Sequence, residues 1–319
     1  MRFVILAAAA ATLISSPSAA SSYIALGDSI TFGETDLLYR QSNGDRGYVD
    51  DFANYLAGQN GGLRPTVVNL AIDGETTGSF VTNAGRTPPV AGRGDVPLQL
   101  ENINYVTNPA SQSQLFGNAV ASQAAIGDPV STITVTLGFN NLAALASLPT
   151  DQALAAAPAT LAEYQTQYAG ILANIRSLAP TADLYLLGYY NPFPADPASP
   201  AAPIFDSYGT QLNAIIATLA GQFDARYVDT ASAFLGREGE LTYLDEQPHG
   251  FVRDGRFGGV EPIGNVHPNE AGYAVIANQL AAASVVPEPS SWALMLVGFG
   301  AIGCAMRRRA GTRTVVRFA

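Results

Sequence analysis

Two short segments near opposite ends of the sequence contain residue types that together can carry out acyl transfer. The first is Gly27-Asp28-Ser29, and the second places His267 directly before Pro268. A serine hydroxyl is a poor nucleophile until a base takes its proton, and histidine suits that role near neutral pH. The other histidine, His249, lies in a segment of loop composition. Ser29 and His267 are therefore the candidate nucleophile and general base.

Two further segments supply hydrogen-bond donors for the negative charge that develops on a carbonyl oxygen during acyl transfer. Gly74 follows one short β-rich run, and Asn140 follows another in Gly138-Phe139-Asn140-Asn141. The backbone N–H groups of Ser29 and Gly74 and the side-chain amide of Asn140 could then form an oxyanion hole. Taken singly, glycine and asparagine are also common in ordinary turns at the ends of strands.

The elements expected around these segments place them at one edge of a sheet. Five short apolar runs predict strands buried on both faces, as parallel strands are. They cover residues 22–26, 66–70, 132–137, 184–189 and 226–228. Between them lie stretches with a helical apolar period, for example Leu161, Tyr164 and Tyr168. This alternation predicts a doubly wound α/β sheet with its ligand site at the carboxyl ends of the strands.

The connections between these elements differ in regularity. Pro268 is expected to open the last helix, in a first-turn position. Residues 75–130, rich in Gly, Asn, Gln and Pro, and residues 191–203, with five prolines, are too long and irregular to be simple crossovers. Such insertions often shape the ligand site of α/β folds, and decoration without function is the equal alternative.

Both ends of the chain have the pattern of sorting signals. Residues 1–20 combine a positive start, an apolar run over residues 3–13 and small residues at Ser18-Ala19-Ala20, as in a secretory signal peptide. A buried N-terminal helix is the alternative. At the other end, Pro287-Glu288-Pro289 precedes an apolar stretch at residues 292–306 and three arginines. A helix of that length spans roughly 22 Å, which is short for a hydrocarbon core of roughly 30 Å.

Residues 287–319 resemble the PEP-CTERM sorting tail of Gram-negative bacteria, because the Pro-Glu-Pro, the apolar stretch and the basic cluster occur in that order. The resemblance implies an exosortase-type processing enzyme as a partner. It also implies transient anchoring in the inner membrane through the tail, and then release to the cell surface or the medium. A plain C-terminal membrane anchor is the alternative.

Between these signals, residues 21–286 form one acidic domain with no sign of a linker. The domain has 10 Arg, no Lys and 25 Asp or Glu, a net charge of −15. Such a charge repels phosphate backbones, which argues against nucleic acid as a partner. The only cysteine, Cys304, lies in the tail, so the sequence predicts neither disulfides nor cysteine metal sites in the domain.

The four chemical segments occur in the order Gly-Asp-Ser-Ile, Asn-x-Ala-x-x-Gly, Gly-x-Asn-Asn and Val-His-Pro-Asn. In this order they resemble the GDSL, or SGNH, hydrolase family across nearly the whole domain. The resemblance implies a flavodoxin-like three-layer sandwich with a five-stranded parallel sheet, and no metal or organic cofactor. It also assigns the roles of the family's four blocks to Ser29, Gly74, Asn140 and His267.

The chain departs from the family at one position. The family usually has Asp three residues before the histidine, to orient its ring, and this chain has Gly264 there. A triad is defined by geometry rather than by sequence position, so another carboxylate could take this role. The candidates are Glu261, Asp254 and Asp245, or, in a Ser-His dyad, Asn265 or a backbone carbonyl.

Together these features predict a secreted serine esterase that hydrolyses carboxylic esters through an acyl-serine intermediate. Acylated glycans, short-chain esters and lipid esters are the candidate substrates, and the sorting tail favours acylated glycans by analogy. The alternative, which the missing Asp supports, is a catalytically weak or inactive surface protein of the same fold that binds exopolysaccharide. A lyase or phosphotransfer enzyme lacks support, because the sequence has no phosphate loop or metal cluster.

Overall fold

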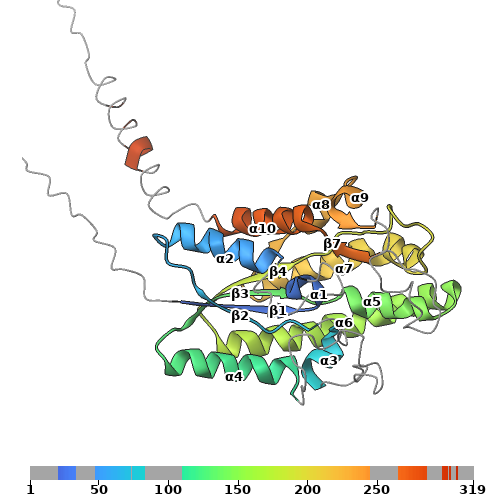
Figure 1. The fold of residues 1–319 in the computed structure, drawn as a ribbon, viewed down its shortest axis with the longest axis horizontal. Coiled ribbons are helices and arrows are strands. Elements are labelled where there is room, and N and C mark those ends of the chain that lie inside the picture. Colours follow the sequence, from blue (N-terminus) through green and yellow to red (C-terminus); the bar gives the residue numbers. More distant parts are fainter. Residues whose placement is uncertain are drawn as a thin grey trace, which may run out of the picture. The chain divides into compact units, whose positions relative to one another are not determined.

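A five-stranded parallel sheet forms the centre of the domain (Figure 1). The computed structural model describes residues 21–33, 47–72, 74–82, 110–244 and 265–285, with residues 297–300, 302 and 307 of the tail. The strands are β1 (Ser22–Gly27), β2 (Thr66–Asn69), β3 (Val130–Thr136), β4 (Asp183–Leu187) and β5 (Arg226–Val228). Their order, β2-β1-β3-β4-β5, confirms the predicted α/β fold.

Strand β1, an interior strand of the sheet, is buried along its whole length. It pairs with β2 and β3 on its two sides, so that Ala25 lies opposite Asn69 on one side and Thr134 on the other. Because all the strands run in the same direction, their carboxyl ends meet at one edge of the sheet. The segments that leave β1, β2 and β3 at this edge are the ones that the sequence singled out.

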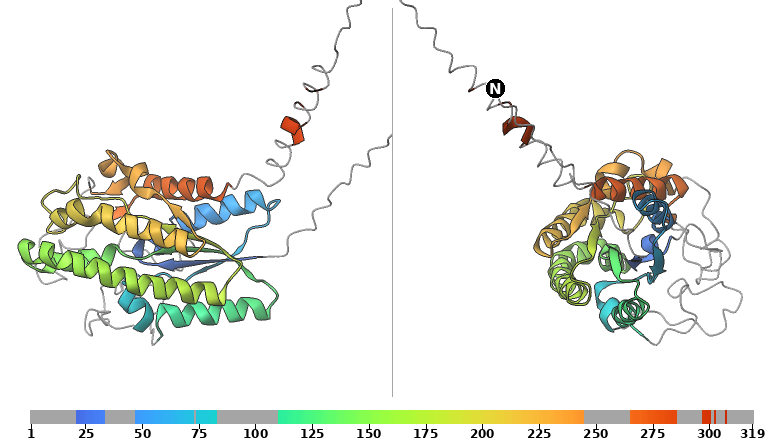
Figure 2. Two further views of the ribbon diagram at one scale, coloured as in Figure 1. Left: turned by 180° about the vertical axis from the view of Figure 1, so that it is seen from behind. Right: turned by 90° about the vertical axis from the view of Figure 1, so that its left-hand side faces the viewer.

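Helices cover both faces of the sheet, which makes three layers (Figure 2). On one face lie α4 (Gln112–Ala125), α6 (Thr150–Leu178) and α7 (Ala202–Gln222), and α6 contacts both of its neighbours. On the other face lie α2 (Tyr48–Gln59) and α10 (Glu270–Ser284). The apolar stripe predicted on α6 is buried. The remaining helices are short: α1 (Ser29–Phe32), α3 (Thr77–Thr82), α5 (Phe139–Ala143), the 3-10 helix η3 (Ala144–Ser147), α8 (Thr230–Phe234) and α9 (Glu238–Leu241).

Regular structure also occupies part of residues 75–130, which the sequence predicted to be irregular. Helices α3 and α4 lie there, and Ser111 caps α4 through a reciprocal pair of hydrogen bonds with Gln114. Helix α4 was not predicted because its apolar period is weak. Only Gln112 and Phe116 are buried along its 14 residues.

A second, two-stranded antiparallel sheet lies apart from the main one. Its strands are β6 (Thr242–Tyr243) and β7 (Asn265–Pro268). The prediction that Pro268 opens the last helix was wrong, because Pro268 is the last residue of β7. Helix α10 begins instead at Glu270, and the side chain of Asn269 accepts a hydrogen bond from the N–H of Gly272 at 3.0 Å.

The predicted signal peptide and most of the predicted membrane segment lie outside the described residues. Among the residues that are described, no helix is both long enough and apolar enough to cross a membrane. The tail belongs to a compact unit of its own, residues 282–319. The domain boundaries at residues 20 and 286 therefore stay predictions.

Candidate active site

Ser29 stands where strand β1 passes into helix α1. Asp28 caps this helix with its side chain, and Ser29 is the first helical residue. The preceding Gly27 has φ +133°, and a Cβ atom there would lie 2.2 Å from the carbonyl oxygen of Thr136 on β3. Glycine is therefore required at this turn. In the described part of the chain, the backbone N–H of Ser29 meets no acceptor.

The turn before Ser29 is held by a buried glutamine that was not predicted from the sequence. Gln112, the first residue of α4, accepts a hydrogen bond from the N–H of Gly27 at 2.6 Å and donates to its carbonyl at 2.9 Å. The same amide donates to a carboxylate oxygen of Glu75 at 2.8 Å. Both Gln112 and Glu75 are fully buried. Helix α4 thus fastens the turn at the candidate nucleophile to the segment after β2.

Asp28 is a buried carboxylate held by hydroxyl groups. It accepts hydrogen bonds from the N–H of Ile30 at 3.1 Å, the hydroxyl of Thr136 at 2.9 Å and the hydroxyl of Tyr189 at 2.6 Å. Burial raises the pKa of Asp28 to about 6, and the hydrogen bonds oppose this rise. Three donors in fixed directions therefore define the position of the residue next to Ser29.

A chain of buried hydroxyl groups continues from Asp28 into the protein. Thr136, which donates to Asp28, also bonds to Thr31 on α1 at 2.7 Å. Thr31 bonds to the hydroxyl of Tyr48 at 2.5 Å, and Tyr48 donates to Thr134 at 3.2 Å. These bonds connect helix α1 with strand β3 and helix α2, so three elements fix the position of the helix that carries Ser29.

Asn140 lies in the helix that follows β3, and its amide nitrogen donates to the carbonyl of Glu75 at 3.1 Å. A side-chain amide has two N–H groups, so one is left for a ligand. Gly74 directly precedes Glu75, has φ +71° and is exposed. Its N–H has no acceptor among the described residues. Asn140 is thus tied to the neighbour of Gly74.

His267 lies on strand β7, which contacts helix α1. The hydroxyl of Tyr190, just after β4, donates to the carbonyl of Val266 at 2.7 Å and so holds this strand. Burial lowers the pKa of His267 to about 4, which leaves the imidazole neutral at pH 7 and able to accept a proton. The residues that fall outside the described part of the chain are Glu261, Asp254, Asp245, His249 and the side chain of Asn265.

Three of the predicted site residues, Ser29, Asn140 and His267, line one cavity of about 120 Å³. Its other walls are Asp28, Ile30, Phe139, Tyr190 and Val266, and Gly74 is not among them. A cavity of roughly 150 Å³ holds one benzene molecule, so this one has room for a short acyl group. No group of three or more His, Cys, Asp or Glu side chains within the described ranges could hold a metal ion.

This arrangement places a hydroxyl, a neutral imidazole and an amide around one small cavity, and acyl transfer uses such a set of groups. A model of the GDSL-like lipase/acylhydrolase family matches residues 25–275. The chain belongs to this family. The PEP-CTERM protein-sorting motif matches residues 285–310, which confirms the predicted type of tail and implies exosortase processing and export.

Solved structures share the fold of this GDSL-family protein. The lipase Lip_vut3 from a goat rumen metagenome has a TM-score of 0.55 at 21% identity, over 83% of this chain and 97% of that one. Phospholipase A1 from Streptomyces albidoflavus has a TM-score of 0.51 at 19% identity, over 83% of this chain and 100% of that one. Axe2, an acetylxylan esterase from Geobacillus stearothermophilus, has a TM-score of 0.50 at 17% identity, over 84% of this chain and 95% of that one. No curated protein matches the sequence.

Several residues around the site of this GDSL-family member were not predicted. Thr136 closes β3, and Tyr189 and Tyr190 follow β4, so attention to the carboxyl ends of the strands could have identified all three. Gln112 gives no such signal, because it begins a helix far along the chain from any strand end that it contacts. Its role is visible only in the folded protein.

Proposed function

We propose that this GDSL-family protein hydrolyses carboxylic esters, with Ser29 as the nucleophile and His267 as the general base. The observation that supports the proposal is the single cavity lined by Ser29, Asn140 and His267. Membership of a lipase and acylhydrolase family supports the same class of reaction.

The reaction proceeds in two halves. First, the Ser29 hydroxyl oxygen attacks the ester carbonyl carbon while His267 takes its proton. The tetrahedral intermediate then breaks its bond to the alcohol, which leaves with the proton from His267, and the acyl group stays on Ser29. In the second half, His267 takes a proton from water, the resulting hydroxide attacks the acyl carbon, and the carboxylic acid leaves as Ser29 regains its proton.

Three donors stabilise the negative charge on the carbonyl oxygen in this proposal: the N–H groups of Ser29 and Gly74 and the amide of Asn140. Neither backbone N–H has an acceptor among the described residues, so both are available. Loss of one such donor typically costs about 3–4 kcal/mol of barrier stabilisation. Glu261 or Asp254 is proposed to orient His267 and to stabilise the imidazolium formed in each half.

The preferred substrate is proposed to be an ester of a short acyl group. A cavity of about 120 Å³ accommodates such a group better than a fatty chain. Lip_vut3, the phospholipase and Axe2 share the fold but, by their names, act on different esters, so the fold leaves the alcohol part open. An acylated glycan at the cell surface is consistent with the sorting motif.

The test is turnover of p-nitrophenyl esters from acetate to palmitate, combined with labelling by a fluorophosphonate probe. We expect the acetate ester to be hydrolysed fastest, and Ser29→Ala to lose both turnover and labelling. The matched control is Ser113→Ala, on helix α4 outside the cavity, which should keep both. Labelling that persists in Ser29→Ala would place the nucleophile elsewhere.

A second function is favoured by one observation, the glycine at position 264 where the family usually has Asp. A catalytically inactive surface protein would bind exopolysaccharide without turning over esters. Absence of turnover and labelling in the wild-type protein would select this function.

We also propose that the tail is cut near residues 287–290 after the domain has been exported. The apolar stretch at residues 292–306 is short for a permanent anchor, and the match to the sorting motif covers it. Intact mass of the native protein tests this. A mass that includes residues 292–309 would show a retained anchor and leave the esterase proposal unaffected.

A further inference from the structure

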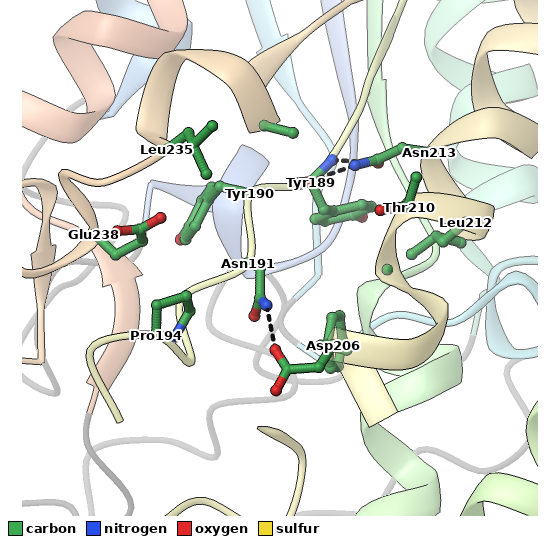
Figure 3. A pocket seen from close by; sticks show the side chains of 13 residues that line it. Tyr189, Tyr190, Asn191, Pro194, Asp206, Thr210, Leu212, Asn213, Leu235 and Glu238 are labelled. Atoms are coloured by element: carbon green, nitrogen blue, oxygen red, sulfur yellow. Dashed lines mark hydrogen bonds between the residues drawn. The ribbon is translucent and has the colours of Figure 1, made fainter. Parts of the chain in front are cut away.

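The domain has a second pocket, larger than the cavity at Ser29 (Figure 3). Its volume is about 280 Å³, and its walls come from the segment after β4, helix α7 and helices α8 and α9. Tyr190 lines both pockets. Tyr189 lines the larger one, while its hydroxyl bonds to Asp28 in the wall of the smaller one. The two pockets therefore share a wall, and a ligand in the larger one would lie across Tyr190 from the cavity that Ser29 lines.

Two carboxylates, those of Glu238 and Asp206, line this pocket. Glu238 is only 7% exposed; one of its carboxylate oxygens accepts from the N–H of Gly236 at 3.0 Å. Its second oxygen has no partner among the described residues. Asp206, across the pocket, accepts from the amide of Asn191 at 3.0 Å and is exposed. Figure 3 shows Asn191 between the two carboxylates.

The aromatic side of the pocket is rigid. The ring of Tyr190 stacks on Phe234 with 4.1 Å between centroids and 12° between planes, and its hydroxyl bonds to Val266. Phe205 contributes a second ring, which packs against Phe193. A pocket with apolar ring surfaces and a few fixed polar groups suits a ligand that has both apolar faces and polar edges.

The carboxylates of Glu238 and Asp206 make this pocket unsuited to a phospholipid headgroup or a fatty chain, two ligands that an esterase of this family could encounter. No basic side chain lines the pocket within the described residues, and Glu238 and Asp206 would repel the phosphate of a phospholipid headgroup. A fatty chain would leave the second carboxylate oxygen of the largely buried Glu238 without a hydrogen-bond donor, which is costly. A neutral sugar meets both requirements, because its hydroxyl groups donate to carboxylates and its ring carbons offer an apolar face.

We propose that this pocket binds the neutral sugar of a glycan, so that an acyl group carried by that sugar reaches Ser29. The placement of the ester rests on the proposed esterase function, but the binding of the sugar does not. Asp206 and Glu238 accept hydrogen bonds from sugar hydroxyls, and Tyr190 separates the sugar from the acyl cavity.

The binding test uses the Ser29→Ala variant and deacetylated xylo-, cello- and manno-oligosaccharides in calorimetric titrations. We expect at least one of these sugars to bind, and Asp206→Asn with Glu238→Gln to weaken that binding by about tenfold or more, since bonds to charged acceptors are lost. The matched control is Asp151→Asn with Glu163→Gln, the same change of charge at exposed positions on helix α6. This control should bind as tightly as the parent.

The catalytic test compares acetylated oligosaccharides with p-nitrophenyl acetate in the protein that retains Ser29. The loss of kcat/KM in the Asp206 and Glu238 double variant should be at least about tenfold larger for the sugar ester, and should appear in KM. Equal losses on both substrates, no sugar binding in the parent, or tighter binding of glycerol phosphate than of any sugar would overturn the proposal. Sugar binding without any hydrolysis of p-nitrophenyl acetate would reject the esterase function and keep the sugar site.

Discussion

The two halves of the candidate site are supported in different ways. Ser29 follows β1, an interior strand of the main sheet, and its turn is held by buried hydrogen bonds that involve Gln112, Thr136 and Tyr189. His267 lies on a ribbon of two short strands apart from that sheet. Tyr190 and Asn269 hold this ribbon in place. The side-chain amide of Asn269 donates to the backbone carbonyls of Thr242 on β6 and of Glu240 on α9.

Because of this difference, substitutions in the two halves of the site should affect stability and activity to different degrees. A change at the nucleophile disturbs the packed centre of the domain, where neighbouring strands leave no room for adjustment. A change at the ribbon disturbs a small unit with few backbone bonds, which can shift while the main sheet stays folded. We therefore expect the nucleophile half to lose stability and activity together, and the histidine half to lose mainly activity.

The largest expected effect comes from adding a methyl group at two glycines that each lie against a backbone carbonyl. In Gly27→Ala the Cβ would lie 2.2 Å from the oxygen of Thr136, at a φ that disfavours alanine, and we expect a loss of roughly 3–5 kcal/mol. In Gly272→Ala the Cβ would lie 2.1 Å from the oxygen of Leu241, directly before β6, and 2.9 Å from the Cβ of Pro268 on β7. We expect a loss of roughly 1–3 kcal/mol there, because the ribbon can shift.

Urea unfolding and ester turnover measure both variants, and each should lose most of its activity. Gly58→Ala, on the exposed side of α2 with nothing within 4 Å, is the control and should gain roughly 0.5–1 kcal/mol. Equal stability losses at Gly27 and Gly272 would show that the ribbon is as rigid as the sheet, and the comparison between the halves would fail.

The next effect is a pair of pH dependences with opposite signs. The folded pKa of Asp28 is about 6, above its ordinary 3.8, so the folded protein keeps a proton that the unfolded chain has lost. Its contribution to stability is therefore present at low pH and is lost as the pH rises to 6. The folded pKa of His267 is about 4, below its ordinary 6.5, so its contribution grows as the pH rises from 4 to 6.5.

Each contribution amounts to as much as about 3 kcal/mol, and in the wild-type protein the two oppose each other. Relative to wild type, Asp28→Asn should gain thermal stability between pH 4 and 6.5, and His267→Gln should lose it over the same interval. Melting temperatures in matched buffers measure both slopes. Two variants with slopes that move in the same direction would contradict the assignment.

The smallest expected effect is the loss of one hydroxyl group from either of two neighbouring tyrosines. Tyr189 supports the half of the site that carries Ser29, and Tyr190 supports the half that carries His267. Tyr189→Phe removes a bond to the buried carboxylate of Asp28 and should cost roughly 1.5–3 kcal/mol. Tyr190→Phe removes a bond to the carbonyl of Val266 and should cost about 1 kcal/mol, with a lower kcat because the strand of His267 is released. Unfolding curves and kcat on p-nitrophenyl acetate give the comparison, and a larger stability loss at Tyr190 would reverse it.

The same division explains how much could be predicted. The five strands of the main sheet are short apolar runs, and the rule that ligand sites lie at their carboxyl ends led to Ser29 and Asn140. The ribbon was not predicted, because β6 has two residues and its partner strand begins more than twenty residues later. A residue that orients His267 needs only to lie near its ring and can occur at any distance from it in the sequence. The sequence therefore does not distinguish Glu261 from Asp254 in this role.

The position of β1 affects when the site can form. This strand lies inside the sheet, between β2 and β3, but at the start of the domain, and Ser22 pairs opposite Val130. The turn at Ser29 depends on Thr136, which lies 108 residues after Asp28. Contacts that distant in sequence are slow to form, because a long loop must close first. A chain synthesised from its amino end thus carries Ser29 in an incomplete turn until β3 has followed it, so the proposed active site cannot form before Thr136 is in place.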